Sequence, residues 1–181
     1  ALKANGLYEN TLIVLISDHG GLSNRGAKNK RELATTNAPF KAGKGHLYEG
    51  GVRVPLLIHL PKQVEQRIES TPVASYDLFP TLTQLSGITP DYSKLDGLSL
   101  AKLITDGKDK ATAQRSLYWH KASERPSSTG DYVSSAVRSG KYKLIDFYKQ
   151  GRVELYDLEN DPQEQNNLVD KEPKVAKKLM G

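Results

Sequence analysis

Two short polar stretches combine residue types that could bind an anion and a cation. The first, SDHGG, contains Asp18 and His19 and directly follows the apolar run TLIVLI. The second, KAGKGHLYEGG, places Lys44 between two glycines and adds His46. A carboxylate and an imidazole can coordinate a hard divalent cation, and an ammonium in a glycine-rich loop can meet an anion together with backbone amides. We interpret these stretches as two walls of one site for a charged ligand.

Both stretches also have a purely structural interpretation. Asp18 could cap a strand end with His19 facing solvent, and the glycine-rich segment could be an ordinary surface loop. Glu49 and Arg53 flank two glycines and are expected to form a structural charge pair. A P-loop is excluded, because that motif needs G-x-x-x-x-G-K-[ST] and this segment has G-K-G.

The elements that must position these residues predict an α/β fold. Residues 11–17 and 54–60 are rich in Ile, Leu and Val, which is typical of strands buried on both faces in a parallel sheet. Ligand groups gather beyond the carboxyl ends of such strands, where Asp18 lies. Residues 20–45 are polar and lack periodicity, and a loop of that length is usually functional. His59 lies inside the second apolar run and is expected to be packed.

The later sequence predicts helices followed by a small antiparallel sheet. SYDLFPTLTQLSG, residues 75–87, predicts a helix with Pro80 in its first turn, and 98–107 a shorter one. Residues 108–115 read as a surface connection. SLYWHK, SSAVRSGKYKLIDFY and RVELYDLEND are strand-like runs with glycine turns, which indicate hairpins, and EPKVAKKLM closes the chain as a short helix. His120, at the end of the first of these runs, is a further candidate for contact with a ligand.

Composition excludes several classes of protein. The chain has 181 residues, 37% hydrophobic and 26% charged, with a net charge of +5, as expected for a soluble globular protein. Basic residues are scattered except for KNKR at 28–31, which is expected to be a solvated loop, so no nucleic-acid partner is predicted. The absence of cysteine excludes disulfides and thiol chemistry. No run reaches the roughly 18 apolar residues of a membrane span. The opening ALKANGLYENT reads as the tail of a helix, so we expect the chain to begin within a domain.

Several of these stretches together resemble one family. LISDHGG, NAPFKAGKGHLYEGGVRVPLLIHLP and ELYDLENDPQEQNNL occur in this order in the sulfatases, the formylglycine-dependent sulfuric ester hydrolases of the alkaline-phosphatase-like fold. The resemblance spans nearly the whole chain and is greatest to bacterial sulfatases acting on sulfated carbohydrates, although Ala42 replaces the first glycine of the usual GGKG. It implies the C-terminal part of an alkaline-phosphatase-like mixed sheet with helices, in residues 1–110, followed by a small antiparallel sheet with a C-terminal helix, in 111–181.

The resemblance also implies roles for the candidate residues. Asp18 would be a Ca²⁺ ligand, His19 would contact the metal or the sulfate, and Lys44 would bind the sulfate. A calcium ion and an ammonium held in a dry pocket would stabilise charge as the S–O bond breaks. His46 and His120 are added as candidate substrate contacts. The expected partners are a sulfated carbohydrate or another sulfate ester and the N-terminal part of the same protein, in a periplasmic or secreted location.

The nucleophile of the family is not expected within this chain. Formylglycine is made from a [CS]-x-[PA]-x-R motif upstream of the SDHG segment, and no such motif precedes it here. The string Ser134–Arg138 fits the pattern, but it follows the metal loop and lies in a strand-like run, so it is rejected. We therefore expect the 181 residues alone to be inactive.

Two other functions remain open at this point. One is a phosphodiesterase or phosphonate hydrolase of the same superfamily. The other is a non-catalytic module that binds sulfated glycans through Lys44, His46, Arg53 and the KNKR loop. Salt-sensitive glycan binding without calcium dependence would favour this module.

Overall fold

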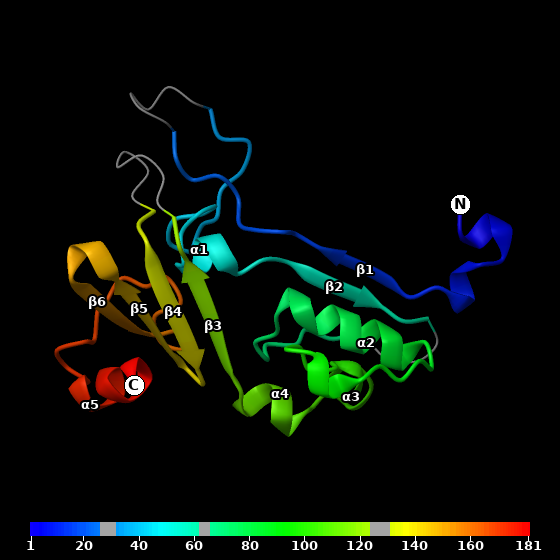
Figure 1. Cartoon of the computed structure of the whole chain (residues 1–181). Helices are drawn as coiled ribbons and strands as arrows, with labels where there is room; N and C mark the ends of the chain where they lie inside the picture. The colour runs from blue at the N-terminus through cyan, green and yellow to red at the C-terminus, as the bar shows by residue number, and fades with distance from the viewer. Residues whose placement is uncertain (26–31, 62–65, 124–130) are drawn as a thin grey trace. The chain divides into compact units, whose positions relative to one another are not determined.

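The computed structural model describes residues 1–25, 32–61, 66–123 and 131–181. They form two compact units, one of residues 1–14 with 58–115 and one of residues 15–57 with 116–181 (Figure 1). The predicted boundary after residue 110 would make each domain one continuous segment. Each unit in the structure instead combines two segments that are separate in the sequence. The KNKR cluster at 28–31 lies outside the described residues.

The first unit is largely helical. Its α-helices are α2 (Leu78–Leu85), α3 (Ala101–Asp106) and α4 (Lys110–Gln114), and its 3-10 turns are Lys3–Asn5, Tyr8–Asn10, Ser75–Asp77 and Tyr92–Lys94. The helix predicted at 75–87 is confirmed, because the turn at Ser75–Asp77 continues into α2 and Gly87 follows with φ of 74°. The helix predicted at 98–107 is confirmed as α3.

A buried carboxylate fixes the start of α2. Asp77 is fully buried, accepts the amide of Ala74 at 2.7 Å and pairs with both terminal nitrogens of Arg115. Burying a charge is tolerated only with such pairing, so this ion pair joins the helix start to the end of the unit. His59 differs from the prediction: it is exposed, with its ring stacked on Tyr8 at 5.2 Å.

The segment 108–115, predicted as a surface connection and a candidate subdomain boundary, is mostly exposed and ends where the first unit ends, but it contains the unpredicted helix α4. Asp109 caps this helix and accepts hydrogen bonds from the amides of Ala111 and Thr112. The five-residue helix is too short to show an apolar period, so only the capping residue could have indicated it.

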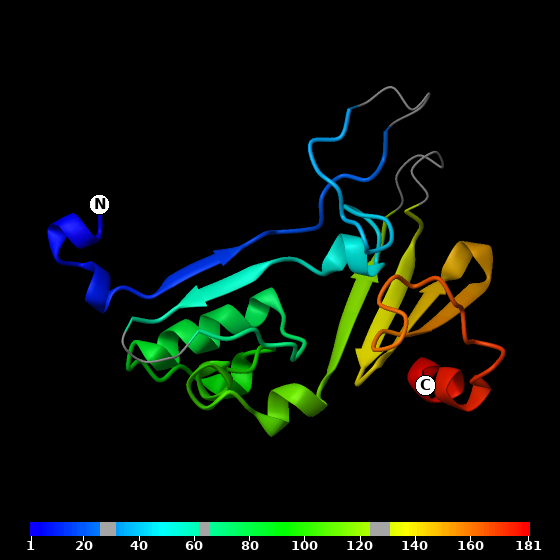
Figure 2. The same cartoon turned by 180° about the vertical axis from the view of Figure 1, so that it is seen from behind.

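The second unit is built on a four-stranded antiparallel sheet. Its strands are β3 (Ser116–Lys121), β4 (Ser134–Ser139), β5 (Tyr142–Phe147) and β6 (Arg152–Asp157), side by side in that order (Figure 2). The predicted hairpins are confirmed. Gly140 and Gly151, with φ of 56° and 54°, supply the left-handed residues of their turns.

Different segments cover the two faces of this sheet. The C-terminal helix α5 (Pro173–Met180), predicted from the sequence, packs through Ala176 against Val137 and Leu144. On the opposite face, Tyr48 and its neighbours pack against Ala136 and Ile145. The glycine-rich segment is thus fixed to one face of the sheet and α5 to the other.

The parallel arrangement and full burial predicted for the first two strands are wrong for the described residues. β1 (Ile13–Ile16) pairs with β2 (Leu56–His59), and the amides of Ser17 and Gly20 donate to Pro55 and Gly51, an antiparallel order. Leu15 and Leu57 are 64% and 58% exposed, because no other described strand extends this two-stranded sheet. An apolar run shows that a strand is suited to burial but does not show which segment buries it.

Candidate active-site loops

The loop after β1 presents a carboxylate and an imidazole next to each other. The side chain of Asp18 is 82% exposed and its Oδ2 lies 3.2 Å from Nε2 of His19. Nδ1 of His19 lies 2.9 Å from the carbonyl oxygen of Gly20, which can only accept, so this nitrogen donates. The Ser17 hydroxyl donates to the carbonyl of His19 at 2.9 Å and steadies the turn. Two potential metal ligands are therefore accessible at the strand end.

The glycine-rich segment is hydrogen-bonded to this loop through the backbone. The amide of Lys44 donates to the carbonyl of Gly21 and the amide of Gly20 donates to the carbonyl of Gly51, both at 3.0 Å. The two stretches that carry Asp18 and Lys44 are thus neighbours within one unit. This is the arrangement that the interpretation as two walls of one site requires.

Glycines make this approach possible because they lack a side chain. A Cβ at Gly20 would lie 1.7 Å from the carbonyl oxygen of Gly50, and one at Gly43 would lie 2.2 Å from that of Gly21. Neither glycine has a positive φ, so unusual dihedral angles do not explain them. Close contact between the two backbones does. The main role of these glycines is to let the two loops touch.

The loop that holds Lys44 is bent by two left-handed residues. Ala42 has φ of 60° and Gly45 has φ of 93°. The first value explains why glycine is usual at the position of Ala42, since an alanine there is strained. His46 stacks on Tyr48, with ring centroids 6.2 Å apart, and its amide donates to the carbonyl of Gly43. Lys44 is exposed at the tip of the loop.

Buried charges anchor the far side of the loop. Glu49 opens the short helix α1 (Glu49–Val52), and its Oε1 lies 3.0 Å from Nζ of the fully buried Lys143 on β5. Lys143 also lies 3.0 Å from Glu164, whose other oxygen accepts the Glu49 amide at 2.6 Å. Burial raises the pKa of Glu164, against the opposing charge of Lys143. The predicted pair of Arg53 with Glu49 is confirmed at 3.7 Å as part of this network.

An aromatic cluster supports the same segment. The phenols of Tyr48 and Tyr156 both donate to Oε2 of Glu154, at 2.7 and 2.8 Å, and burial is the main cause that raises the pKa of each. The ammonium of Lys41 lies 4.2 Å from the ring centroid of Tyr48 and donates to the carbonyl of Glu164. These contacts fix Lys41 and Tyr48 to the core of the second unit, whereas Lys44 stays exposed.

The structure does not bring His120 to these loops. On β3 it alternates with Trp119, which packs on the face with Tyr48, so His120 faces the other side of the sheet. There its Nδ1 lies 2.8 Å from Oγ of Ser135, and its ring lies near Tyr148.

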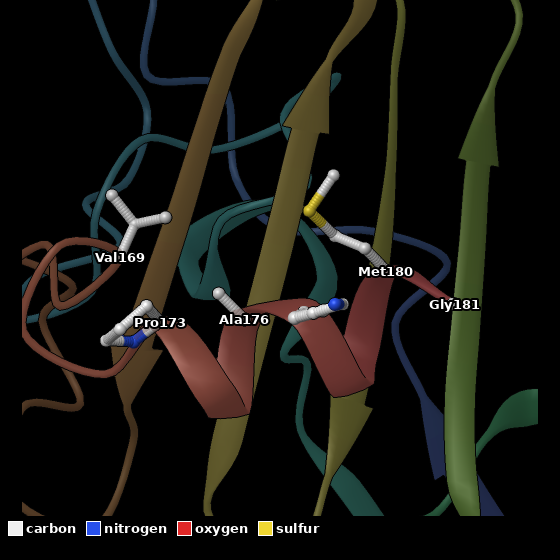
Figure 3. Close-up of a pocket in the computed structure, with 6 residues that line it drawn as sticks. Val169, Pro173, Ala176, Met180 and Gly181 are labelled. Atoms are coloured by element: carbon white, nitrogen blue, oxygen red, sulfur yellow. The ribbon is translucent and has the colours of Figure 1, made fainter.

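A pocket of about 500 Å³ lies on α5 and is separate from the loops (Figure 3). Its lining consists of Val169, Pro173, Ala176, Lys177, Met180 and Gly181. Because α5 covers the face of the sheet opposite Tyr48, this pocket and Lys44 are on different sides of the sheet.

The donors at the β1 end suit a hard cation but form an incomplete set. Asp18 supplies carboxylate oxygens and His19 an imidazole, whereas the part of the chain that the structure describes contains no group of three His, Asp or Glu side chains that could hold a metal. Calcium takes six to eight oxygen ligands. Further ligands would have to come from outside the described residues.

Lys143, Glu164 and Asn37 frame the site but are not predicted from the sequence. A buried lysine in a strand of alternating pattern carries no distinguishing signal. Asn37, which binds both loops, has one cue, because it lies in a polar segment of a length that is usually functional.

Comparisons with known proteins identify the family of this chain. Residues 42–180 match the family model described as N-sulphoglucosamine sulphohydrolase, C-terminal. A sulfatase of Formosa agariphila is 32% identical over 94% of this chain, which spans 31% of that protein. An N-acetylglucosamine-6-O-sulfatase of Bacteroides thetaiotaomicron is 30% identical over 99% of this chain, which spans 30% of that protein.

A solved structure confirms the predicted fold class. The crystal structure of Ps i-CgsB in complex with k-i-k-neocarrahexaose matches 98% of this chain and 36% of its own, with a TM-score of 0.80 and 31% identity. No helix in the described part of the chain is long and apolar enough to cross a membrane. The chain belongs to the N-sulphoglucosamine sulphohydrolase C-terminal family and corresponds to the C-terminal portion of sulfatases, which hydrolyse sulfuric esters.

Proposed function

We propose that the parent enzyme hydrolyses sulfate esters of a sulfated carbohydrate, and that the two joined loops form half of its active site. Asp18 and His19 would hold a calcium ion, and Lys44, with His46 close by in the sequence, would contact the sulfate. The observation that carries the proposal is the backbone pairing of Lys44 with Gly21 and of Gly20 with Gly51.

Each residue has a distinct task in this proposal. The Asp18 carboxylate would hold the cation, and His19, whose Nδ1 lies 2.9 Å from the Gly20 carbonyl, would contact the metal or the sulfate. The ammonium of Lys44 binds peripheral sulfate oxygens and stabilises charge on them as the ester bond breaks. When bound, calcium supplies further electrostatic stabilisation at the same oxygens. The formylglycine nucleophile is expected from the N-terminal part of the protein, so the 181 residues alone are expected to be inactive.

Two relatives support a carbohydrate as the substrate. One is named for a sulfatase of N-acetylglucosamine, and the Ps i-CgsB structure contains a neocarrahexaose. His120 is assigned no role in this proposal, because it faces the side of the sheet opposite the two loops. A periplasmic or secreted location follows from this substrate class.

The test compares the full-length wild type with Lys44→Ala. Hydrolysis of an aryl sulfate and of a sulfated glucosamine is measured, and Lys44→Ala should lower kcat/KM by about 10²–10³-fold, as loss of a charge-stabilising donor does. Lys178→Ala, which removes an exposed lysine on α5, is the matched control and should match the wild type. Chelation with EGTA should abolish turnover, and added Ca²⁺ should restore it.

Two results would contradict the proposal. Lys44→Ala could retain full activity, or the wild type could cleave an aryl phosphodiester in preference to every sulfate ester. The second result would favour the phosphodiesterase alternative on the same fold.

A further inference from the structure

Asn37 occupies the point where the two candidate loops meet. Its Nδ2 donates to the carbonyl of Gly21 at 2.7 Å and to that of Ala42 at 3.0 Å. Its Oδ1 accepts the amide of Gly21 at 2.8 Å. The side chain thus binds both backbone groups of Gly21, three residues after Asp18, and a carbonyl two residues before Lys44.

Only a primary amide satisfies all three contacts. The two carbonyls need N–H donors and the Gly21 amide needs an acceptor, and an asparagine side chain presents both within one planar group. A carboxylate of the same size would place an acceptor oxygen against two carbonyl oxygens. An alanine would leave all three backbone groups without these bonds.

The Gly21 carbonyl is shared by the two loops. It accepts from Asn37 and also from the amide of Lys44 at 3.0 Å. The amide of Asn37 fills the space between the loops, since a Cβ at Gly43 would lie 2.4 Å from its Nδ2. A displacement of Asn37 therefore changes the separation of the Asp18 loop and the Lys44 loop.

We propose that Asn37 is a positioning residue that sets the distance between the metal-binding strand end and the sulfate-binding Lys44. This inference rests on the proposed function, because it gives Asn37 the task of aligning the two halves of that site. The hydrogen bonds of Asn37 go to the backbone of Gly21 and Ala42. It acts through Gly21 and Ala42.

The test uses the full-length enzyme with Asn37→Ala and Asn37→Asp. Both variants should lower kcat/KM for an aryl sulfate by about 10–100-fold, as loss of a residue that orients a site does. Asn37→Asp should lose at least as much as Asn37→Ala. The inhibition constant of inorganic sulfate should rise in parallel with KM, because Lys44 no longer meets the anion at the correct distance.

A second readout does not depend on activity. Hydrogen exchange of the peptide covering residues 41–48 should accelerate in both variants, since the amide of Lys44 loses a fixed partner, whereas exchange in β4 and β5 should stay at the wild-type rate. Thr36→Val is the matched control. The Thr36 hydroxyl accepts the nearby amide of Ala38, at 3.1 Å, and not a group of either candidate loop within the described residues, so this variant should retain wild-type kinetics and exchange.

The outcomes separate this inference from the proposed function. Wild-type KM, sulfate inhibition and exchange in both Asn37 variants would overturn the role of Asn37, even if Lys44→Ala is inactive. A wild type without sulfatase activity would overturn the proposed function, and exchange of residues 41–48 would still decide whether Asn37 joins the loops. Acceleration of exchange throughout the unit, with unchanged sulfate inhibition, would show a general structural role and also refute the positioning role.

Discussion

Lys143 is a fully buried cation whose removal would take the ammonium away from Glu164 and leave Glu49 with the more distant Arg53 and Arg138, each at 3.7 Å. It lies 3.0 Å from both Glu49 and Glu164. Lys143→Met keeps most of the side-chain volume but removes the charge, so we expect a loss of about 3–5 kcal/mol in the free energy of unfolding. Urea unfolding would measure this loss.

Lys141→Met provides the matched control in the same hairpin. Lys141 pairs with Asp157 at 2.7 Å but is partly exposed, and such pairs contribute about 1 kcal/mol or less. Equal losses in the two variants would show that the burial of Lys143 has no energetic importance.

Asp157 makes stability depend on pH in the acid range. The hydrogen bond from Lys141, followed by bonds from the side chain and backbone of Asn160 and the amide of Glu159, lowers the pKa of Asp157 from 3.8 to about 2. A depressed pKa in the folded state stabilises the protein above the unfolded-state pKa, and this contribution is lost as the pH falls through the folded value.

Wild-type stability should therefore fall more steeply than that of Asp157→Asn between about pH 5 and about pH 2. Unfolding by urea at a series of pH values gives the two slopes. Asp170→Asn, which changes an exposed carboxylate in the same unit, should keep the wild-type slope. Parallel curves for wild type and Asp157→Asn would contradict the assignment.

At the scale of elements, the contact between the two loops depends on the absence of side chains. In Gly20→Ala the new Cβ would meet the backbone carbonyl of Gly50 at 1.7 Å, and backbone cannot rotate away. We expect a loss of about 1–3 kcal/mol or more in stability, together with reduced sulfatase activity.

Gly21→Ala is the graded comparison for this loop contact. Its Cβ would meet chiefly the methyl group of Thr35, at 2.4 Å, and this side chain can change rotamer. The loss should therefore be smaller than for Gly20→Ala. If thermal unfolding ranks the two variants in the opposite order, the close backbone approach does not explain Gly20.

Elements with local signals were predictable from the sequence. The cap and proline of α2, the turn glycines of the hairpins and the proline at the start of α5 each act within a few residues. The antiparallel pairing and the exposure of β1 could not be predicted, because Ile, Leu and Val indicate a strand regardless of which segment covers it. α1 was missed because its four residues are held by contacts with Lys143 and Glu164, far away in sequence.

At the scale of the whole molecule, the candidate site combines residues that no local pattern connects. Asp18 and Lys44 were identified by residue type and by resemblance, and the structure adds that their loops are hydrogen-bonded. The supporting residues come from β5 and from the segment after β6. Their identification needs the fold, since burial and pairing across more than a hundred residues leave no periodic trace in the sequence.

The bond from the Glu49 amide to Glu164 links positions 115 residues apart. During synthesis, the Lys44 segment leaves the ribosome well before Glu164, and such a long loop closes only after the intervening chain is available. A nascent chain that stops short of Glu164 would carry every candidate ligand of this unit and still lack the frame that shapes them. The frame around Lys44 is therefore complete only after β6 and the turn that follows it have been synthesised, so the loops of the proposed site reach their final form late.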